Sequence, residues 1–489
     1  MDFNTRYAKL NDNQRQAVDY IHGSLLVIAG PGTGKTELLS MRTAQILKQT
    51  DTLPNSILCL TFTESGATNM RQRLRQIIGE DAYKIAIHTF HSFGTEIINQ
   101  HREYFFRGAD AQPVDELTQY QIISGILEGL DWRNPLSAKN NGEFVYIKDL
   151  IRIISEFKQS GLTPSELRAI IEDNQSTIAE IAPDIQQVFS AKISKKTIEM
   201  FAPIAEKIAN LAAKNPDEKN SKLPASITPY ANVLALSIVH ATQEAIDENS
   251  TKPLTAWKNK WCEKNANGEF VLKDFTAAEK LSAAIDVYEK YVNILSERSL
   301  FDYDDMILSV IQACESHPEL RANLQEQFQF IMVDEFQDTN LAQLRLLFNL
   351  TSENDDNPNI MAVGDDDQAI FSFQGADVGN IQRFRQHYHD PKIIVLTDNY
   401  RSAESILSSA RDVITQGADR LENTIDGLSK QLTAHANSEG SKVEIQEFSS
   451  VGEERAGIAK QIAKLIKNGE KPENITIIAR HHKELIEIL

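Results

Sequence analysis

A chain of 489 residues exceeds one ordinary domain, so about three compact units are expected. Hydrophobic residues make up 41% and charged residues 24%, as in soluble globular proteins, and no apolar run of about 18 residues predicts a membrane-spanning helix. The net charge of −19, taken alone, argues against nucleic acid as a partner, because phosphate contacts need positive charge. It does not exclude a local basic or aromatic channel that binds nucleic acid. The polar N-terminal sequence has no signal-peptide pattern and the three cysteines are isolated, so the cytoplasm is the expected compartment.

Six short apolar runs predict buried parallel strands. Helical patterns follow several of them: apolar residues recur at three- and four-residue spacing after residue 63, and Asn340 with Gln343 fits a capping pair. Alternation of strands and helices predicts an α/β fold with a parallel sheet and ligands at the carboxyl ends of its strands. The predicted strands span residues 24–30, 57–63, 84–88, 330–334, 360–364 and 393–397.

The stretch between about residues 103 and 300 has a different character. It is helical in pattern, rich in Ile, Ala, Lys and Glu, and carries no phosphate-binding or acidic motif. Strand-like segments that carry such motifs lie on both sides of it. The stretch is therefore interpreted as a helical domain inserted into the sheet domain. The predicted boundaries are 1–104 and 298–396 for the two parts of the sheet domain, 105–297 for the insertion and 397–489 for a second α/β unit.

The C-terminal part predicts the beginning of that second unit. Residues 424–442 are polar and resemble a loop, followed by a strand (442–448), a helix and a last strand (475–479). The helix has Ile458 and Ile462 on one face and Gly469 as its expected C-cap. Roughly two strands would leave open sheet edges, so a truncated chain with an incomplete second unit is expected.

A glycine-rich segment, AGPGTGKT, fits the phosphate-loop pattern G-x-x-x-x-G-K-[ST] and stands between a predicted strand and a predicted helix. Backbone N–H groups of such a loop surround phosphates, Lys35 reaches the β- and γ-phosphates of ATP, and the Thr36 hydroxyl holds Mg²⁺. A chance glycine-rich turn is the alternative, which the flanking strand and helix disfavour. The predicted phosphate-binding residues are Ala29, Gly30, Pro31, Gly32, Thr33, Gly34, Lys35 and Thr36.

Two acids end the predicted strand at residues 330–334. Asp334 is the candidate metal carboxylate, and Glu335 is the candidate base that orients and deprotonates the attacking water. An apolar strand that ends in two acids is also a common solvated terminus. The interpretation therefore depends on the phosphate loop.

With these blocks in view, the sequence resembles superfamily 1 DNA helicases of the UvrD/Rep/PcrA type. DEFQDTN and GDDDQ are much more specific than the phosphate loop and separate this family from kinases, GTPases and transporters. The resemblance implies a RecA-like sheet with a large helical insertion and an incomplete second RecA-like domain. The matching blocks are LNDNQRQAV (10–18), AGPGTGKT (29–36), LTFTESGATNMRQRL (60–74), TFHSFG (89–94), VDEFQDTN (333–340), VGDDDQAIFSFQGA (363–376) and TDNYRSAESIL (397–407).

The resemblance also implies roles at the nucleotide. Gln14 would read adenine through its amide, and Tyr400 would stack on the base. Arg401 would reach the γ-phosphate from a neighbouring domain, and Gln368 would link the γ-phosphate to the DNA-facing loop. Lys35, Asp334, Glu335, Gln368 and Arg401 are thus the implied catalytic set.

Single-stranded DNA contacts are implied at residues in three of the blocks. Core packing is the alternative for the phenylalanines, and a structural hydrogen bond is an equal alternative for His91. Base stacking on aromatic rings tolerates any sequence, as a translocating motor requires. The implied contacts are Thr61, Phe62, His91, Phe371 and Phe373.

Three departures from the family pattern stand out. Glu37 occupies a position where the family often has an adenine-contacting arginine, and Arg42 is the candidate substitute. Gln374 replaces an arginine that contacts DNA. The family's last motifs lie beyond the region that matches.

The implied activity is an ATP- and Mg²⁺-dependent motor that moves 3′ to 5′ on single-stranded DNA and acts on single/double-strand junctions in repair or recombination. The chain itself is expected to bind Mg·ATP and to be a weak motor alone. One alternative is a helicase-like subunit that binds DNA or a nuclease partner without unwinding. Another is an unrelated P-loop ATPase, which leaves DEFQDTN, GDDDQ and NYRS unexplained. The residues predict neither the pathway nor the oligomeric state.

Overall fold

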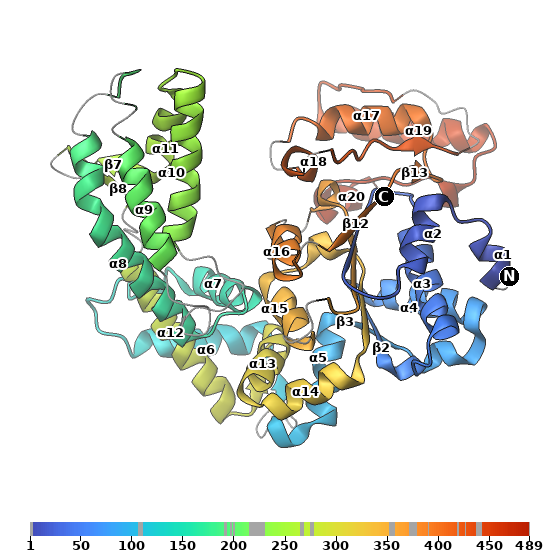
Figure 1. The fold of residues 1–489 in the computed structure, drawn as a ribbon, viewed down its shortest axis with the longest axis horizontal. Helices are drawn as coiled ribbons and strands as arrows, with labels where there is room; N and C mark the ends of the chain where they lie inside the picture. Colours follow the sequence, from blue (N-terminus) through green and yellow to red (C-terminus); the bar gives the residue numbers. More distant parts are fainter. Residues whose placement is uncertain are drawn as a thin grey trace. The chain divides into compact units, whose positions relative to one another are not determined.

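A computed structural model of the chain divides it into two compact units, each described here by itself (Figure 1). The first comprises Met1–Tyr400 and Ala418–Leu432, and the second Arg401–Gly417 and Thr433–Leu489. Among the helices that the structure describes, none is both long and apolar enough to cross a lipid bilayer. The described residues are 3–105, 111–189, 193–195, 198, 201–214, 230–264, 268–273, 278–351, 357–370, 379–389, 391–417, 420–425, 427–436 and 443–488.

A six-stranded parallel sheet forms the centre of the first unit, which confirms the predicted α/β fold and all six predicted strands. The strand order is β12-β1-β11-β10-β2-β3, so strands from before and after the helical stretch join in one sheet. Leu26 of β1, for example, pairs with Ala362 on one side and Ile393 on the other. The strands are β1 (Leu25–Ala29), β2 (Ile57–Thr61), β3 (Ala86–Thr89), β10 (Phe330–Val333), β11 (Ile360–Gly364) and β12 (Lys392–Leu396).

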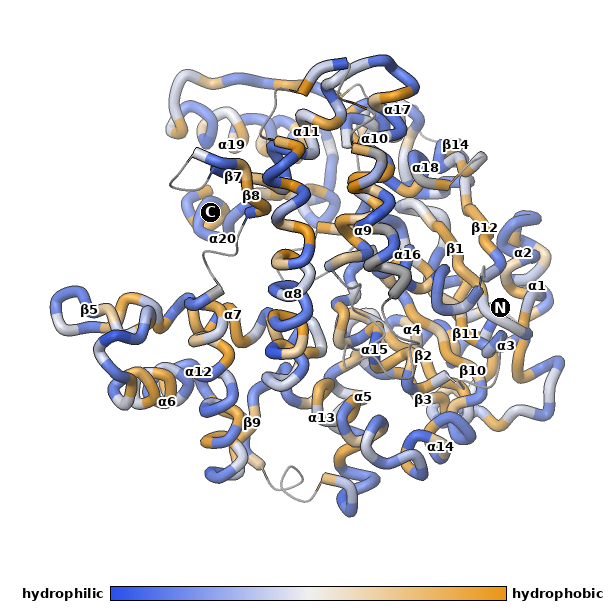
Figure 2. Tube along the Cα trace, turned by 60° about the vertical axis from the view of Figure 1, so that its left-hand side comes forward, coloured by the Kyte–Doolittle hydropathy of each residue, from blue (hydrophilic) through white to orange (hydrophobic). Residues whose placement is uncertain are grey.

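Helices cover both faces of the sheet, which explains why its strands are continuous apolar runs (Figure 2). Alternate residues of β1 enter two different cores: Leu26 and Ile28 face one, and Leu25 and Val27 face the other. One face packs against α2 (Asp12–Asp19), α3 (Lys35–Gln49) and α4 (Glu64–Ile78). The other packs against α5 (Phe90–Gln100), α13 (Tyr303–Ser316), α14 (Pro318–Gln327), α15 (Leu341–Leu350) and α16 (Gly379–His387).

Side-chain caps begin two of these helices, and one of the two caps was predicted from sequence. Asn340 and Gln343 form a reciprocal capping box at the start of α15, as expected. Thr63 caps α4 by accepting a hydrogen bond from the Gly66 backbone N–H. Both caps satisfy backbone donors that a helix start leaves without an intrahelical partner.

The segment between β3 and β10 is mostly helical and contains two apolar cores of its own. One core joins α6, α7 and α12, and the other joins α8, α9, α10 and α11. The short strands β4 (Gln112–Pro113) and β9 (Leu300–Phe301) pair in parallel, so the segment leaves and re-enters the sheet region at one place. The helices are α6 (Glu116–Glu128), α7 (Ile147–Gln159), α8 (Pro164–Phe189), α9 (Ala202–Lys214), α10 (Tyr230–Asp247), α11 (Lys252–Trp261) and α12 (Ala278–Glu297).

Buried ion pairs join this helical segment to the sheet domain. Lys158 at the end of α7 is fully buried, and its Nζ lies 2.6 Å from Asp302 Oδ2 and 2.5 Å from Asp305 Oδ1. Burial raises the pKa of Asp305 to about 6, although Lys158 opposes the shift. Arg345 of α15 makes a second link, with Nη2 2.6 Å from Glu166 Oε1 of α8.

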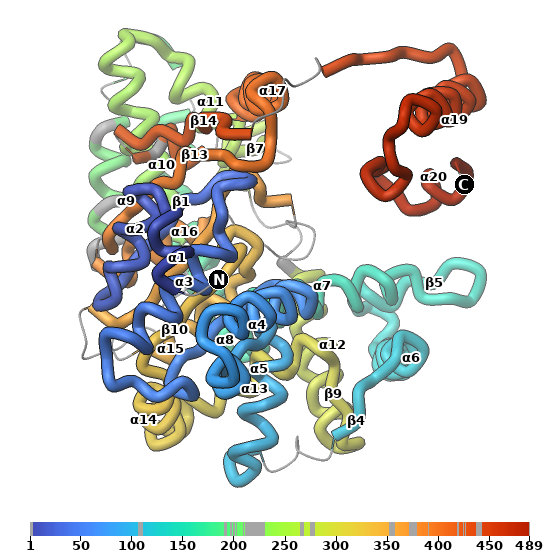
Figure 3. Tube along the Cα trace, turned by 90° about the vertical axis from the view of Figure 1, so that its right-hand side faces the viewer, coloured from blue at the N-terminus to red at the C-terminus, as the bar shows by residue number. Residues whose placement is uncertain are grey.

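In the second unit the predicted helix is confirmed and the two predicted strands are wrong. The helix is α19 (Val451–Lys467), and Gly469 follows it with φ +99° (Figure 3). The described residues of 442–448 and 475–479 form no strand, and Ile445 and Ile478 are 96% and 89% exposed. A strand requires a hydrogen-bonded neighbour, which an apolar sequence pattern alone does not supply.

The other elements of the second unit are short. They are α17 (Glu404–Ile414), β14 (Thr433–Ala434) and α20 (His482–Ile486). The predicted loop at 424–442 is confirmed for residues 427–432, which form neither helix nor strand and belong to the first unit. It is wrong at its start, where Thr424 ends α18 (Leu421–Thr424), and at residues 433–434, which form β14. Residues 437–442 lie outside the described part of the chain.

Candidate active site

The phosphate loop connects β1 to α3 through two glycines in the left-handed region of backbone space. Gly32 has φ +69° and Gly34 has φ +87°, a conformation that residues with a side chain rarely adopt. Gly34 is the N-cap of α3 and provides no side-chain acceptor to the first turn. The N–H groups at this helix start are therefore suited to an anion such as a phosphate.

Three predicted catalytic side chains meet beside this loop, although Lys35 is 300 residues or more from the other two in sequence. Lys35 Nζ donates to Glu335 Oε2 at 2.7 Å and to Gln368 Oε1 at 3.4 Å. The Lys35 side chain is 11% exposed and that of Glu335 is 38% exposed, so the pair is sheltered but open on one side. A ligand phosphate can reach the ammonium from that side.

Asp334 lies at the carboxyl end of β10 and is half-buried. Burial raises its pKa to about 6, the neighbouring Glu335 carboxylate adds to the rise, and Lys35 opposes it. A divalent cation held by this carboxylate and the Thr36 hydroxyl would favour the ionised form. Glu335 itself has φ +49°, a strained conformation for a non-glycine residue that is frequent at functional sites.

Gln337 connects the two acidic blocks, a role that the sequence did not reveal. Its Nε2 donates to Glu335 Oε2 at 2.9 Å, and its Oε1 accepts from the Asp365 backbone N–H at 3.1 Å. Gly364 allows this approach, because a Cβ there would lie 2.7 Å from Gln337 Oε1. The sequence indicated only that Gln337 and Gly364 belong to blocks that match the family.

The two residues expected to bind the adenine base lie on the other side of the loop. Gln14 Nε2 donates to the Thr33 carbonyl at 2.9 Å, and the Tyr400 backbone N–H donates to the Gly32 carbonyl at 3.0 Å. Asn11, which the sequence did not single out, donates to the Tyr400 hydroxyl at 3.2 Å and caps the helix that carries Gln14. The Tyr400 side chain is 49% exposed, so its ring has a face available for stacking.

The proposed substitution of Arg42 for an adenine-contacting arginine is wrong. Arg42 is 1% exposed, and its guanidinium donates to the backbone carbonyls of Ala17, Tyr20 and Ile21. It anchors the end of α2 in the core, where no base can reach it. Glu37 is held instead by two arginines.

Those two arginines come from different helices. Arg6 Nη1 lies 2.9 Å from Glu37 Oε1, and Arg73 Nη1 lies 3.2 Å from Glu37 Oε2. The negative charge that departs from the family pattern is therefore neutralised locally. Neither arginine was identified from the sequence.

The residues implied to contact DNA differ in accessibility. Thr61 ends β2 with 3% exposure and donates its hydroxyl to the Thr63 carbonyl at 2.9 Å. Phe62 and His91 are half-buried at the carboxyl ends of neighbouring strands, and burial lowers the pKa of His91. Phe371, Phe373 and Gln374 lie outside the described residues, and Arg401 is the first residue of the second unit.

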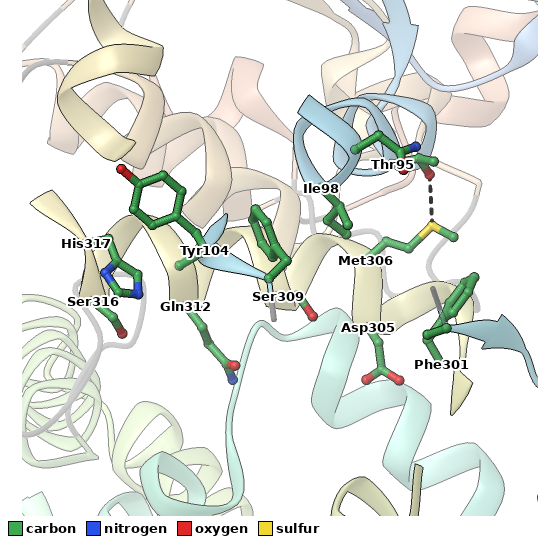
Figure 4. Close-up of a pocket in the computed structure, with 14 residues that line it drawn as sticks. Thr95, Ile98, Tyr104, Phe301, Asp305, Met306, Ser309, Gln312, Ser316 and His317 are labelled. Atoms are coloured by element: carbon green, nitrogen blue, oxygen red, sulfur yellow. Dashed lines mark hydrogen bonds between the residues drawn. The ribbon is translucent and has the colours of Figure 1, made fainter. Parts of the chain in front are cut away.

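A cavity of about 540 Å³ lies elsewhere, between α5 and α13 (Figure 4). Its lining mixes apolar side chains such as Ile98 and Met306 with polar ones such as Ser309 and Gln312. Thr95 donates a hydrogen bond to the Met306 sulfur at 3.2 Å across one wall. No residue of the phosphate loop or of the acidic blocks lines it, so it is separate from the candidate active site.

Comparison with known proteins agrees with this geometry. The UvrD/REP helicase N-terminal domain family matches residues 10–193 and 179–389, and the UvrD-like helicase C-terminal domain family matches residues 394–489. The ATP-dependent DNA helicase PcrA of Staphylococcus epidermidis is 27% identical over 479 residues, which cover 98% of this chain and 48% of that protein. PcrA of Staphylococcus aureus is 27% identical over 471 residues, covering 96% and 48%. The chain spans about half the length of these relatives, and the extent of the family matches shows that it belongs to the UvrD/REP helicase family.

Proposed function

We propose that this chain is the nucleotide-binding portion of an ATP-dependent DNA helicase. The observation that carries the proposal is the meeting of Lys35, Glu335 and Gln368 beside a glycine loop that begins a helix. One cation, one carboxylate and one amide around a phosphate-binding loop are the groups that phosphoryl transfer to water requires.

Each group has a distinct task at the nucleotide. The loop N–H groups and Lys35 would bind the β- and γ-phosphates, while Thr36 and Asp334 would hold Mg²⁺. Mg²⁺, when bound, would supply positive charge that offsets the charge of the phosphates. Glu335 orients the attacking water and accepts its proton. The donor set fits this ion, because Mg²⁺ prefers hydroxyl, carboxylate and phosphate oxygens.

Lys35 would couple nucleotide binding to the availability of Glu335 as the general base. Its ammonium is bonded to the Glu335 carboxylate, and a γ-phosphate would compete for the same ammonium. When the phosphate takes over this contact, the carboxylate becomes available to a water molecule. Gln368, at 3.4 Å from the same ammonium, is placed to respond to that exchange.

The DNA would lie across the carboxyl ends of β2 and β3, where Phe62 and His91 are half-buried. Phe62 provides a ring on which a base can stack, and Gln14 and Tyr400 hold the adenine of ATP on the loop side. Phe371, Phe373 and Arg401 are proposed to complete the DNA and γ-phosphate contacts. The resemblance extends the proposal to single/double-strand junctions, movement from 3′ to 5′, a cytoplasmic role in repair or recombination, and a nuclease or repair protein as partner.

Comparison of two lysines on the same helix tests the phosphate site. Lys35→Ala should abolish Mg·ATP hydrolysis, with a loss of roughly a thousandfold or more in turnover, about 4 kcal/mol. Lys48→Ala, an equal charge change at an exposed position of α3, should leave turnover unchanged. Turnover and binding of a fluorescent ATP analogue are measured with and without single-stranded DNA. Undiminished turnover by Lys35→Ala would refute the assignment.

A further inference from the structure

Three consecutive aspartates precede Gln368, and one lysine binds all of them. Lys430 Nζ lies 3.0 Å from Asp365 Oδ1, 2.6 Å from Asp366 Oδ1 and 2.7 Å from Asp367 Oδ2. Lys430 is 7% exposed, and Asp365 and Asp366 are 3% and 8% exposed. The three carboxylates are close enough together to hold a metal ion, but the lysine ammonium occupies their centre.

Arg420 adds a second cation from the same stretch of chain. Its Nε and Nη2 lie 2.8 and 2.7 Å from the two oxygens of Asp367, and Nη2 also lies 2.8 Å from Glu422 Oε2. The Leu421 backbone N–H donates to Asp366 Oδ2 at 2.8 Å. Residues 420–425 and 427–432 are called the cationic strap below.

The strap is fixed by apolar contacts as well as by charge. Leu421 is buried in the core that covers one face of the sheet, and Ile425 and Leu428 pack against it. At the other end, a Cβ on Gly30 of the phosphate loop would lie 3.0 Å from the Leu432 side chain. The strap therefore reaches from the acidic turn to the phosphate loop itself.

The charges of this cluster stabilise one another in a place that water reaches poorly. Burial alone would lower the pKa of Lys430, but the carboxylates outweigh it and the pKa is raised. The pKa of Asp367 is lowered, because Arg420 and Lys430 outweigh the opposite effect of burial. Removing one partner of such a cluster leaves buried charge uncompensated.

A chain of hydrogen bonds leads from the strap to the phosphate site. Asp365 bonds to Lys430 through one carboxylate oxygen and accepts from Gln368 Nε2 through the other, at 2.8 Å. The carbonyl oxygen of the Gln368 amide then faces Lys35 Nζ at 3.4 Å. The orientation of the Gln368 amide thus depends on Asp365, whose orientation depends on Lys430.

We propose that Lys430 and Arg420 are positioning residues that hold Gln368 toward the γ-phosphate by clamping the acidic turn before it. This inference rests on the proposed function, because it takes the Gln368 amide as the group that meets the γ-phosphate. In sequence, the strap is flanked on both sides by residues of the second unit, 401–417 and 433 onward. The strap is therefore continuous along the chain with residues of the second unit on both sides.

Substitutions that keep side-chain length test the clamp. Lys430→Met should lower DNA-stimulated turnover about tenfold or more, while the affinity for a non-hydrolysable ATP analogue should change by less than about threefold. Lys48→Met, at an exposed position of α3, is the matched control and should change neither quantity. Loss of analogue affinity in proportion to turnover would contradict a positioning role.

A double-mutant cycle shows whether Lys430 acts through Gln368. In a Gln368→Ala background, Lys430→Met should cost little further turnover, because the group that it positions is already absent. Independent, additive losses would overturn the proposal. Asp365→Asn combined with Lys430→Met should recover part of the loss, since it removes one uncompensated carboxylate.

A measurement without nucleotide separates this inference from the proposed function. Lys430→Met removes one of the two cations that lower the pKa of Asp367. The stability that this lowering contributes is present above the unfolded pKa of an aspartate, about 3.9, and is lost as pH falls below it. The unfolding temperature of the variant should therefore approach that of the unmodified chain as pH falls from about 6 to 3. A pH-independent difference would count against the clamp. Retained turnover by Lys35→Ala would instead refute the proposed function and leave this result unchanged.

Discussion

Two lysines of the first unit, each paired with carboxylates, illustrate two different uses of an ion pair. Lys35 is 11% exposed and bonds to Glu335, whose side chain is 38% exposed. Lys158 is fully buried between Asp302 and Asp305, which are 12% and 19% exposed. The first pair is open to an incoming anion and can exchange partners. The second is enclosed and can only hold the helical segment to the sheet domain.

The surroundings of the two lysines reinforce the difference. The Lys158 ammonium lies 5.9 and 5.1 Å from the ring centres of Tyr288 and Tyr291, so aromatic faces complete its environment. Among the described residues, the Lys35 ammonium bonds to the Glu335 carboxylate and the Gln368 amide. An ion pair can take part in chemistry only where a ligand can reach it, so the exposure of the Lys35 pair supports its proposed role.

The largest effect is expected from a substitution in the Lys35–Glu335 pair. Glu335→Gln keeps the shape and the hydrogen bond to Lys35 but removes the base, so ATP turnover should fall roughly 10²- to 10⁴-fold. Binding of the Mg·ATP analogue should persist, because the phosphate contacts remain. Turnover that survives this change would mean that Glu335 is only a structural partner, like the aspartates around Lys158.

Breaking the enclosed pair should affect stability instead of chemistry. Lys158→Met leaves Asp302 and Asp305 buried without a cation, which should cost about 3–5 kcal/mol in the free energy of unfolding. Denaturant titration measures the loss, and ATP turnover of the remaining folded protein should be normal. Arg152→Met on the same helix, whose side chain is 73% exposed, is the control and should cost little. A fully stable Lys158→Met variant would show that the junction does not depend on charge.

The same junction should give a smaller, pH-dependent effect. The pKa of Asp305 is raised to about 6 in the folded chain, so folding favours its protonated form. A raised carboxyl pKa contributes stability below the unfolded value, and this contribution is lost as pH rises through about 6. Asp305→Asn should therefore reduce the fall in stability between about pH 4 and 7. Identical pH profiles for the two proteins would exclude Asp305 as the source.

Among the proposed DNA-binding residues, the loss of one aromatic ring should have a moderate effect. Phe62→Ala should weaken single-stranded DNA binding by about 1–3 kcal/mol without a change in ATP analogue affinity. Fluorescence anisotropy with a labelled oligonucleotide measures the difference. Tyr83→Ala removes an aromatic ring that is 55% exposed outside the family blocks and should leave DNA affinity unchanged. Equal affinities of Phe62→Ala and the parent chain would assign Phe62 to the core.

The smallest effect is expected from removal of a helix N-cap. Asn340→Ala removes the side chain that accepts from the Gln343 backbone N–H at 2.9 Å, and should cost about 1 kcal/mol of stability. The Asn340 side chain bonds to the start of α15 and has no role assigned at the nucleotide, so turnover per folded molecule should be unaffected. A large loss of turnover would show that α15 positions the catalytic carboxylates.

Local patterns made much of this structure predictable. The six strands are continuous apolar runs because both faces of the sheet are covered, and the capping box at Asn340 depends on neighbours in sequence. Lys35, Asp334 and Glu335 stand next to strand ends, where parallel topology brings them together. The placement of Phe371, Phe373 and Arg401, and the domain boundaries, remain predictions.

The residues that escaped prediction act over long sequence distances. Arg420, Lys430 and Lys158 lie outside the family blocks, and Gln337 lies in one without an assigned role. Tertiary packing determines the partners of all four. Arg42 was misinterpreted for the same reason, since nothing local shows that it points into the core. The strands expected at 442–448 and 475–479 failed because a strand depends on a neighbour that a one-dimensional pattern cannot provide.

The pairing of β4 with β9 has a consequence for how such chains diversify. Gln112 lies opposite Leu300 and Pro113 opposite Phe301, so the helical segment begins and ends at adjacent points. A segment whose two ends lie side by side can be lengthened, shortened or replaced without altering the path of the sheet into which it is inserted. Changes in the length or sequence of this helical segment can therefore accumulate while the sheet domain keeps its architecture.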